Sequence, residues 1–140
     1  MVDALWIVRG DAELASFASP ESMPEVHVGR GANGVAVRFA GAPLEPSSVV
    51  ASKSFTVQHL PSGTVLPGTM SAHPGNRMRF TADASFELGE HRVEVRGDDP
   101  AVTSMTGSPL DGEIRPSDPT WPTGDGQPGG NLVCRFTIGD

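Results

Sequence analysis

The sequence predicts an all-β protein, an antiparallel β-sandwich, and three observations support this prediction. Apolar and polar residues alternate over most of the chain, which is the pattern of strands with one buried and one solvated face. Turn sequences such as "PSGT", "HPGN" and "ELGE" separate these segments at the intervals expected of a sandwich. The 17 Gly and 13 Pro residues exceed average usage and are scattered, so many turns are expected.

The first half of the chain contains three expected strands. "LWIV", in an N-terminal extension over residues 1–30, is expected to add a strand, and Trp6 is expected to be a core residue. "DAELASFA" fits about two helical turns with Asp11 as the N-cap, and "EPSSVVA" fits a single turn that starts at Pro46. "EVHVGR" and "GVAVRFA" alternate as strands, joined by the turn "GRGANG".

Four further segments alternate in the second half, namely "SFTVQHL", "RMRFTA", "HRVEVRG" and the final "LVCRFTI". The alternation predicts one core that contains Val37, Phe39, Phe55, Val57, Phe80, Val93, Val95, Cys134 and Phe136. A chain of 140 residues is long enough for one such core, so residues 1–140 are expected to form a single domain.

Residues 98–130 interrupt this pattern with a long segment rich in Pro, Gly and Asp. Irregular connections of more than about 15 residues are uncommon in compact domains and are usually functional or disordered. Because the segment is anchored by the last strand, we expect it to be an interaction loop, with Trp121, Asp118 and Asp125 as its binding residues. Trp121, held between two prolines, could stack on a sugar ring or plug a neighbouring protein, and could equally cap the edge of its own sandwich.

Acidic residues near the two ends of this loop are candidate calcium ligands. They share the hard carboxylate oxygens that Ca²⁺ selects, and they lie in "GDDP" and "LDGE". The candidates are Asp98, Asp99, Asp111 and Glu113, to which Asp118 and Asp125 could add. The pattern differs from an EF-hand, and turn Asp residues that bond their own backbone are the ordinary explanation for "DG" and "SD". No other cofactor is expected.

Charge and hydropathy exclude several classes of partner. A formal net charge of -7 argues against nucleic acid, whose phosphates need a basic face, and against anionic lipid. No window approaches the ~20 apolar residues of a membrane span, so no membrane insertion is expected, and "LWIV" lacks the features of a secretory signal. The single cysteine, Cys134, allows no internal disulfide and is expected to be an inert core thiol.

No pattern of residues predicts catalysis. No serine lies in a G-x-S-x-G sequence. The four histidines lie in separate strands or turns, at His27, His59, His73 and His91. They form no H-x-x-x-H pair, and a single cysteine cannot complete a zinc-finger pattern. We therefore expect no catalytic residues and no enzyme.

Four segments over residues 33–139 follow one another in a recognisable order, namely "VAVRFAGAPLEPSSVVASKSFTVQ", "GTVLPGTM", "MRFTADASFELGEHRVEVRG" and "CRFTIG". In this order the chain resembles the bacterial Ig-like domains of the Big_5 or SbsA-type family. One family segment, "F-x-x-P-hydrophobic-[DE]-P-x-S-V", is matched by Phe39, Pro43, Leu44, Glu45, Pro46, Ser48 and Val49. A second, "L-x-x-G-x-[YH]-x-V-x-V-x-G", runs from Leu88 to Gly97, with His91 in place of the family's usual Tyr.

The resemblance implies an Ig-like β-sandwich that binds, spaces or assembles, and it carries over no catalytic residues. At the corner position, His91 is expected to bond a backbone group with a partly buried ring, as the Tyr of a tyrosine corner does. Residues 1–30 fall outside the resemblance, and the family's short stretch after Gly97 is expanded here. The family occurs in surface and secreted proteins, and a cytoplasmic location is also compatible with the chain.

Two functional hypotheses of different classes follow. The first is a non-catalytic Ig-like interaction module, a structural or adaptor subunit of a larger assembly or surface structure, with other proteins or copies of itself as partners. The alternative is a ligand-binding module for carbohydrate or calcium, built from the 98–130 loop. Fold likeness alone does not decide between them.

Overall fold

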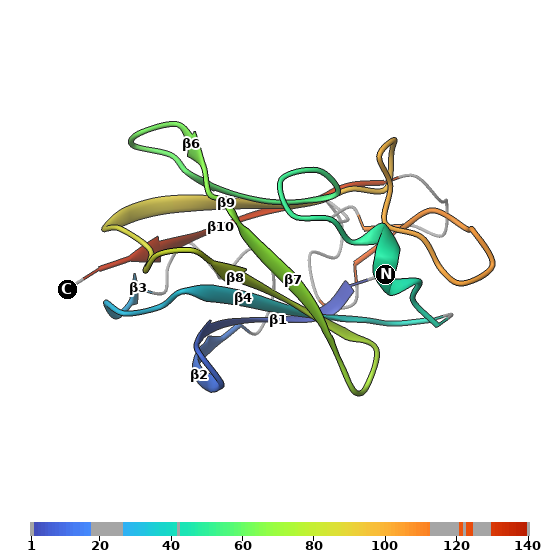
Figure 1. The fold of residues 1–140 in the computed structure, drawn as a ribbon, viewed down its shortest axis with the longest axis horizontal. Coiled ribbons are helices and arrows are strands. Elements are labelled where there is room, and N and C mark those ends of the chain that lie inside the picture. Colours follow the sequence, from blue (N-terminus) through green and yellow to red (C-terminus); the bar gives the residue numbers. More distant parts are fainter. Residues whose placement is uncertain are drawn as a thin grey trace.

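The structure is a computed structural model that describes residues 2–17, 27–41, 43–112, 121, 123–124 and 130–139. The fold is all-β, with two sheets packed as a sandwich, which confirms the predicted fold class. Figure 1 shows most strands of both sheets running along the long axis of the molecule. The described residues between Val95 and Leu132 contain no strand of either sheet, in agreement with the predicted loop before the last strand.

The first sheet has the strand order β2–β1–β4–β8–β7. It consists of β1 (Val2–Arg9), β2 (Ala12–Ser16), β4 (Gly34–Phe39), β7 (Gly68–His73) and β8 (Arg77–Ala82). The second sheet, in the order β3–β10–β9–β5–β6, consists of β3 (His27–Val28), β5 (Phe55–His59), β6 (Thr64–Val65), β9 (Gly89–Val95) and β10 (Leu132–Ile138). Neighbouring strands are antiparallel, except that the short β3 runs parallel to β10.

The strand order is that of an immunoglobulin sandwich. In such domains strands A, B, E and D form one sheet, and strands C, F and G form the other. The first sheet of this protein contains the equivalents of A, B, E and D, which are β1, β4, β8 and β7 in that order. The second sheet contains the equivalents of C, F and G, which are β5, β9 and β10. Because β2 pairs with the outer edge of β1, the N-terminal hairpin extends the first sheet by one strand.

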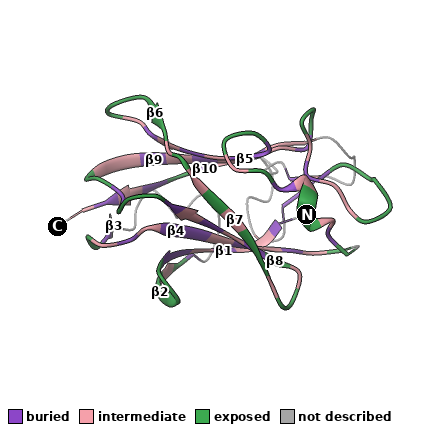
Figure 2. Ribbon diagram, in the orientation of Figure 1, coloured by how far each residue is buried: buried purple, intermediate pink, exposed green. Residues whose placement is uncertain are grey.

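Alternation along the strands builds the core between the two sheets. All nine predicted core residues are buried in one cluster, which confirms Val37, Phe39, Phe55, Val57, Phe80, Val93, Val95, Cys134 and Phe136. Phe55 of β5 and Phe80 of β8 join the two sheets, with ring centroids 6.0 Å apart. Exposed residues lie instead along the edge strands β2 and β7, as Figure 2 shows.

Two predictions for the N-terminal segment are wrong. The chain after Asp11 forms strand β2 rather than two helical turns. A positive φ of 58° at Gly10 allows a tight reversal after β1, and pairing places Ala15 opposite Ile7, a tertiary contact that outweighs helix propensity. Trp6 does not belong to the core, because the buried Leu5 and Ile7 on either side of it turn Trp6 to the outward face of the sheet.

The described part of the long loop packs against one end of the sandwich. Val102 is buried in the core, and the Thr103 carbonyl accepts a hydrogen bond of 3.0 Å from the backbone N–H of Glu45. Thr123 is tied to the start of β1, because its N–H donates to the Val2 carbonyl at 2.8 Å and its hydroxyl accepts from the Val2 N–H at 3.0 Å. These residues of the loop are therefore part of the folded domain.

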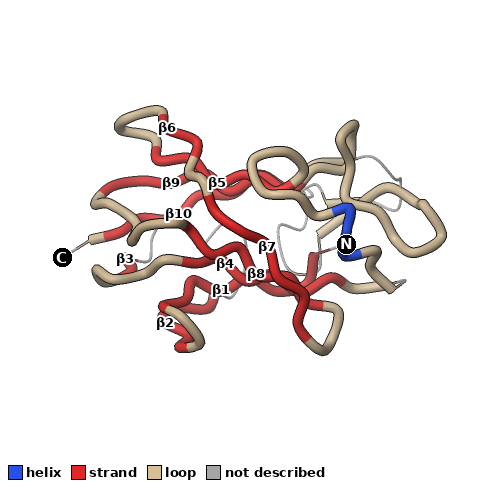
Figure 3. The backbone as a smooth tube through the Cα atoms, in the orientation of Figure 1, coloured by secondary structure: helices blue, strands red, loops and turns tan. Residues whose placement is uncertain are grey.

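One helical turn, η2 (Pro46–Ser48), confirms the prediction made from "EPSSVVA", with Pro46 at its start. Figure 3 shows it as the blue segment at the end of the sandwich where several loops gather. Within the described ranges, no helix is long and apolar enough to cross a membrane.

Candidate functional site

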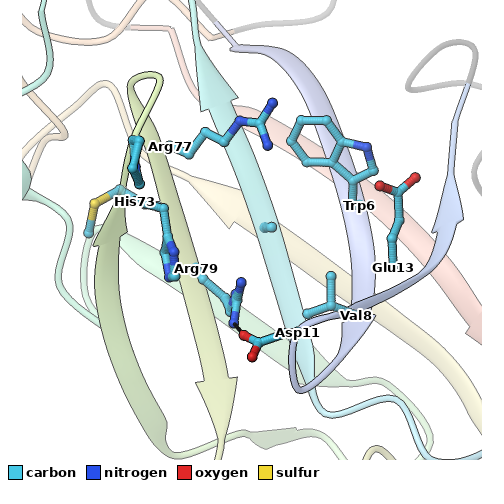
Figure 4. A pocket seen from close by; sticks show the side chains of 10 residues that line it. Trp6, Val8, Asp11, Glu13, His73, Arg77 and Arg79 are labelled. Carbon is cyan, nitrogen blue, oxygen red and sulfur yellow. Dashed lines mark hydrogen bonds and ion pairs between the residues drawn. The ribbon is translucent and has the colours of Figure 1, made fainter.

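A groove of about 340 Å³ lies on the outward face of the first sheet. Figure 4 shows the aromatic and charged side chains that line it, among them Trp6, Asp11, Glu13, His73, Arg77 and Arg79. They come from β1, β2 and the turn between them on one side, and from β7 and β8 on the other. We call this surface the Arg–Trp face and define it by Trp6, Glu13, Arg38, Arg77 and Arg79.

Strand register creates the groove. Trp6 of β1 pairs with Ala36 of β4, and Ala36 pairs in turn with Arg79 of β8, so the three side chains form one row across the sheet. Neighbouring side chains in such a row are about 5 Å apart at Cβ. Because Ala36 carries only a methyl group, space opens between the larger Trp6 and Arg79, and Ala36 lines the groove.

Two guanidinium groups lie over the ring of Trp6. The central carbon of Arg77 is 4.9 Å from the ring centroid and that of Arg38 is 5.8 Å from it. Such cation–π contacts contribute about 0.5–1 kcal/mol each at exposed sites. Arg38 also donates from Nε to Oδ1 of Asp3 at 2.7 Å. An arginine stacked on an aromatic ring keeps the N–H groups at the edge of its planar guanidinium available for further hydrogen bonds.

Arg79 forms an ion pair with Asp11, with 2.8 Å between Nη1 and Oδ1. The hydrogen bond and the charge of Arg79 hold the pKa of Asp11 below its usual value. Solvent screens this pair, since the Asp11 side chain is 97% exposed, and its contribution to stability is small. The Nε of Arg79 is buried and has no hydrogen-bond partner in the described part of the chain.

The Arg–Trp face carries one cation and one anion without an ion pair. Other arginines pair with a carboxylate, among them Arg38, Arg79, Arg92, Arg96 and Arg135. Among the described residues, the exposed Arg77 pairs with no carboxylate and the exposed Glu13 pairs with no cation. Figure 4 shows them on opposite sides of Trp6.

The predicted calcium ligands form no cluster within the described residues. Asp98 accepts a hydrogen bond of 2.8 Å from Nε of Arg96, which lowers the pKa of Asp98, and Asp99 offers its backbone carbonyl to the same guanidinium at 3.0 Å. The described His, Cys, Asp and Glu side chains, the half-buried Asp111 included, form no group of three that could hold a metal ion. Glu113 lies outside the described residues, so calcium binding stays a prediction.

Trp121 lies against the core of its own sandwich. Its half-buried ring packs on the core cluster, and its Nε1–H donates to the carbonyl of Phe17 at 2.9 Å. This is the geometry of the capping role, one of the alternatives predicted for Trp121, and it leaves only part of the ring open to a sugar or a neighbouring protein. Asp118 and Asp125, predicted to bind together with Trp121, lie outside the described residues.

His91 bonds a backbone group, as predicted for the corner position, because its Nδ1–H donates to the Gly89 carbonyl at 3.1 Å. The ring is fully rather than partly buried, stacked on Phe136 with centroids 5.0 Å apart, and Nε2 has no partner among the described residues. Burial lowers the pKa of His91, so the ring is neutral at pH 7. Cys134 is buried as predicted, and burial raises the pKa of its thiol to about 12.

Ser62 and His59 are in hydrogen-bond contact but lack the geometry of a catalytic pair. The Ser62 hydroxyl donates to Nδ1 of His59 at 2.7 Å, and Nε2–H of His59 donates to the Leu88 carbonyl at 2.9 Å. In a catalytic triad the orienting carboxylate binds the ring nitrogen remote from the serine. Glu87 instead approaches the same Nδ1, at 3.9 Å. The contact therefore stabilises the turn after β5.

The Arg–Trp face was not predicted from the sequence. Alternation in "RMRF" correctly placed Arg77 and Arg79 on the outward side, and the same period applied to "LWIV" would have added Trp6. Glu13 could not be placed, because its segment was predicted to be helical. Comparison with known proteins gives no further guide, since no family model, curated protein or solved structure matches the chain.

Proposed function

We propose that the chain is a non-catalytic interaction module, a structural or adaptor subunit of a larger protein assembly, and that the Arg–Trp face is its contact surface. The observation that carries the proposal is Arg77, whose guanidinium carbon lies 4.9 Å from the centroid of the Trp6 ring and which has no carboxylate partner among the described residues. A guanidinium in contact with an aromatic ring can still form paired hydrogen bonds to a carboxylate. Trp and Arg are also enriched among the residues that dominate the energy of protein interfaces.

The position of these residues on a sheet supports the same proposal. Side chains on paired strands are held in place more firmly than side chains on loops, which suits a recognition surface. Trp6 and Arg77 come from β1 and β8, both inner strands of the first sheet. The resemblance to bacterial Ig-like domains that bind, space or assemble agrees with this role.

A capture experiment tests the proposal. The purified chain is immobilised as wild type, as Trp6→Ala and as Arg77→Ala, and is exposed to the proteins of its native source together with an untagged copy of itself. We expect the wild type to retain specific proteins that both variants lose. Arg135→Ala, on the second sheet, is the matched control and should retain them. Equal retention by all four baits would contradict the proposal.

A further inference from the structure

We infer that the partner that fits the Arg–Trp face is a second copy of this chain, bound face to face about a two-fold axis. The inference rests on the proposed function of this face and names its occupant. Among the described residues, the face carries an unpaired cation, Arg77, and an unpaired anion, Glu13, in the same groove. A two-fold contact between copies pairs both of them at once.

The placement of the two charges suits such symmetry. Arg77 and Glu13 lie on opposite sides of Trp6, as Figure 4 shows. A two-fold axis that passes close to Trp6 in the plane of the contact exchanges the two positions, so that Arg77 of each copy meets Glu13 of the other. Trp6 then lies near the centre of the contact, where the residues that dominate binding energy usually cluster.

The charge balance of the face favours a second copy over an acidic partner. The whole chain has a formal net charge of -7. The charges in and beside the groove are equal in number, with three cations, Arg38, Arg77 and Arg79, and three anions, Asp3, Asp11 and Glu13. Two copies therefore meet there without an excess of like charge. An acidic segment could pair with Arg77, but Asp11 and Glu13 would repel it.

Charge at this contact determines specificity more than affinity. Exposed ion pairs contribute little to binding, whereas like charges brought together at an interface are strongly unfavourable. Reversal of one charge acts twice in each dimer, because symmetry repeats the pair. We therefore expect Arg77→Glu or Glu13→Arg to weaken self-association by at least about tenfold.

The test is charge-swap complementation, followed by sedimentation velocity on the purified full chain over a concentration series. The samples are wild type, Arg77→Glu, Glu13→Arg, and an equimolar mixture of the two variants. In the mixture the introduced glutamate of one chain meets the introduced arginine of the other, and the unchanged Glu13 and Arg77 meet at the second contact, so both ion pairs return. Lys53→Glu and Glu87→Arg make the same changes of net charge at exposed positions outside the Arg–Trp face.

We expect a wild-type dimer, monomers of each face variant, dimers of the mixture, and wild-type behaviour of both controls. Recovery in the mixture also shows that both variants are folded. A wild type that stays monomeric at every concentration overturns the inference, as does a mixture that stays monomeric. A monomeric wild type that still captures a different protein through Trp6 and Arg77 overturns self-association and leaves the proposed function standing.

Discussion

Replacement of the two tryptophans by alanine should separate folding from binding. The chain has two tryptophans, and they face opposite environments. Trp121 packs on the core and donates to Phe17, whereas Trp6 lies on the outward face beneath two guanidinium groups. We expect Trp121→Ala to destabilise the fold without changing association between folded chains, and Trp6→Ala to abolish association at little cost in stability.

The magnitudes follow from the contacts. Truncation of a fully buried Trp lowers the free energy of unfolding by about 3–5 kcal/mol. Because the ring of Trp121 is half-buried, we expect its truncation to cost roughly half of that. Loss of the hydrogen bond to Phe17 adds about 1 kcal/mol, so Trp121→Ala should lower the free energy of unfolding by about 3 kcal/mol. Trp121→Phe keeps most of the packing and should lose about 1 kcal/mol. Trp6→Ala loses mainly its two cation–π contacts, which together contribute about 1–2 kcal/mol.

Urea unfolding followed by circular dichroism measures all three variants against wild type, with the slope of each transition as a check on two-state behaviour. Sedimentation velocity below the unfolding transition measures their association. Loss of less than about 0.5 kcal/mol in Trp121→Ala would refute the packing of that ring. Loss of association in a folded Trp121→Ala chain, with association intact in Trp6→Ala, would return the binding role to the long loop.

Three further predictions concern the core, pH and calcium. Phe80→Ala removes a fully buried ring that stacks on Phe55, and should lower the free energy of unfolding by about 3–5 kcal/mol in a urea melt; a loss under about 1 kcal/mol would mean that the core is misassigned. Because the folded-state pKa of His91 lies below 6.5, the unfolded chain takes up the proton first, so stability should fall as pH drops below about 6.5. In His91→Phe the free energy of unfolding should change less with pH, as measured by urea melts between about pH 5 and pH 7. An unchanged pH dependence in this variant would mean that other titrating groups cause it. If the predicted ligands Asp98, Asp99, Asp111 and Glu113 bind calcium, millimolar Ca²⁺ should raise the melting temperature. Equal melting temperatures in chelator and in calcium would contradict that hypothesis.

Inner strands such as β4 and β9 were predictable from the sequence because each carries its own signal. In "GVAVRFA" and "HRVEVRG" the apolar residues recur at every second position, and Val37 and Val93 are fully buried as this period requires. Strand β7 carries no such signal, since "GTMSAH" lies at the edge of the sheet with many exposed residues. Its place depends on pairing with β8, which no local pattern reveals.

The candidate site was not predictable because it depends on register across the sheet. Trp6, Ala36 and Arg79 are far apart in the sequence and meet in one row only through the pairing of β1, β4 and β8. Glu13 joins them through a hairpin whose second strand has the local composition of a helix. For Trp121 the sequence left capping and binding open, since its contact with Phe17 joins residues 104 positions apart.

The most direct test of the Arg–Trp face as the surface buried on association uses Trp6 as its own reporter. In a Trp121→Phe chain, Trp6 is the only tryptophan. Acrylamide quenching of its fluorescence, measured across the concentration range in which sedimentation shows association, reports how accessible that ring is. Quenching should fall as the associated fraction rises, because the face of one copy covers that of the other. Quenching that stays constant while the chains associate would mean that association uses a different surface, and would contradict the assignment of the Arg–Trp face.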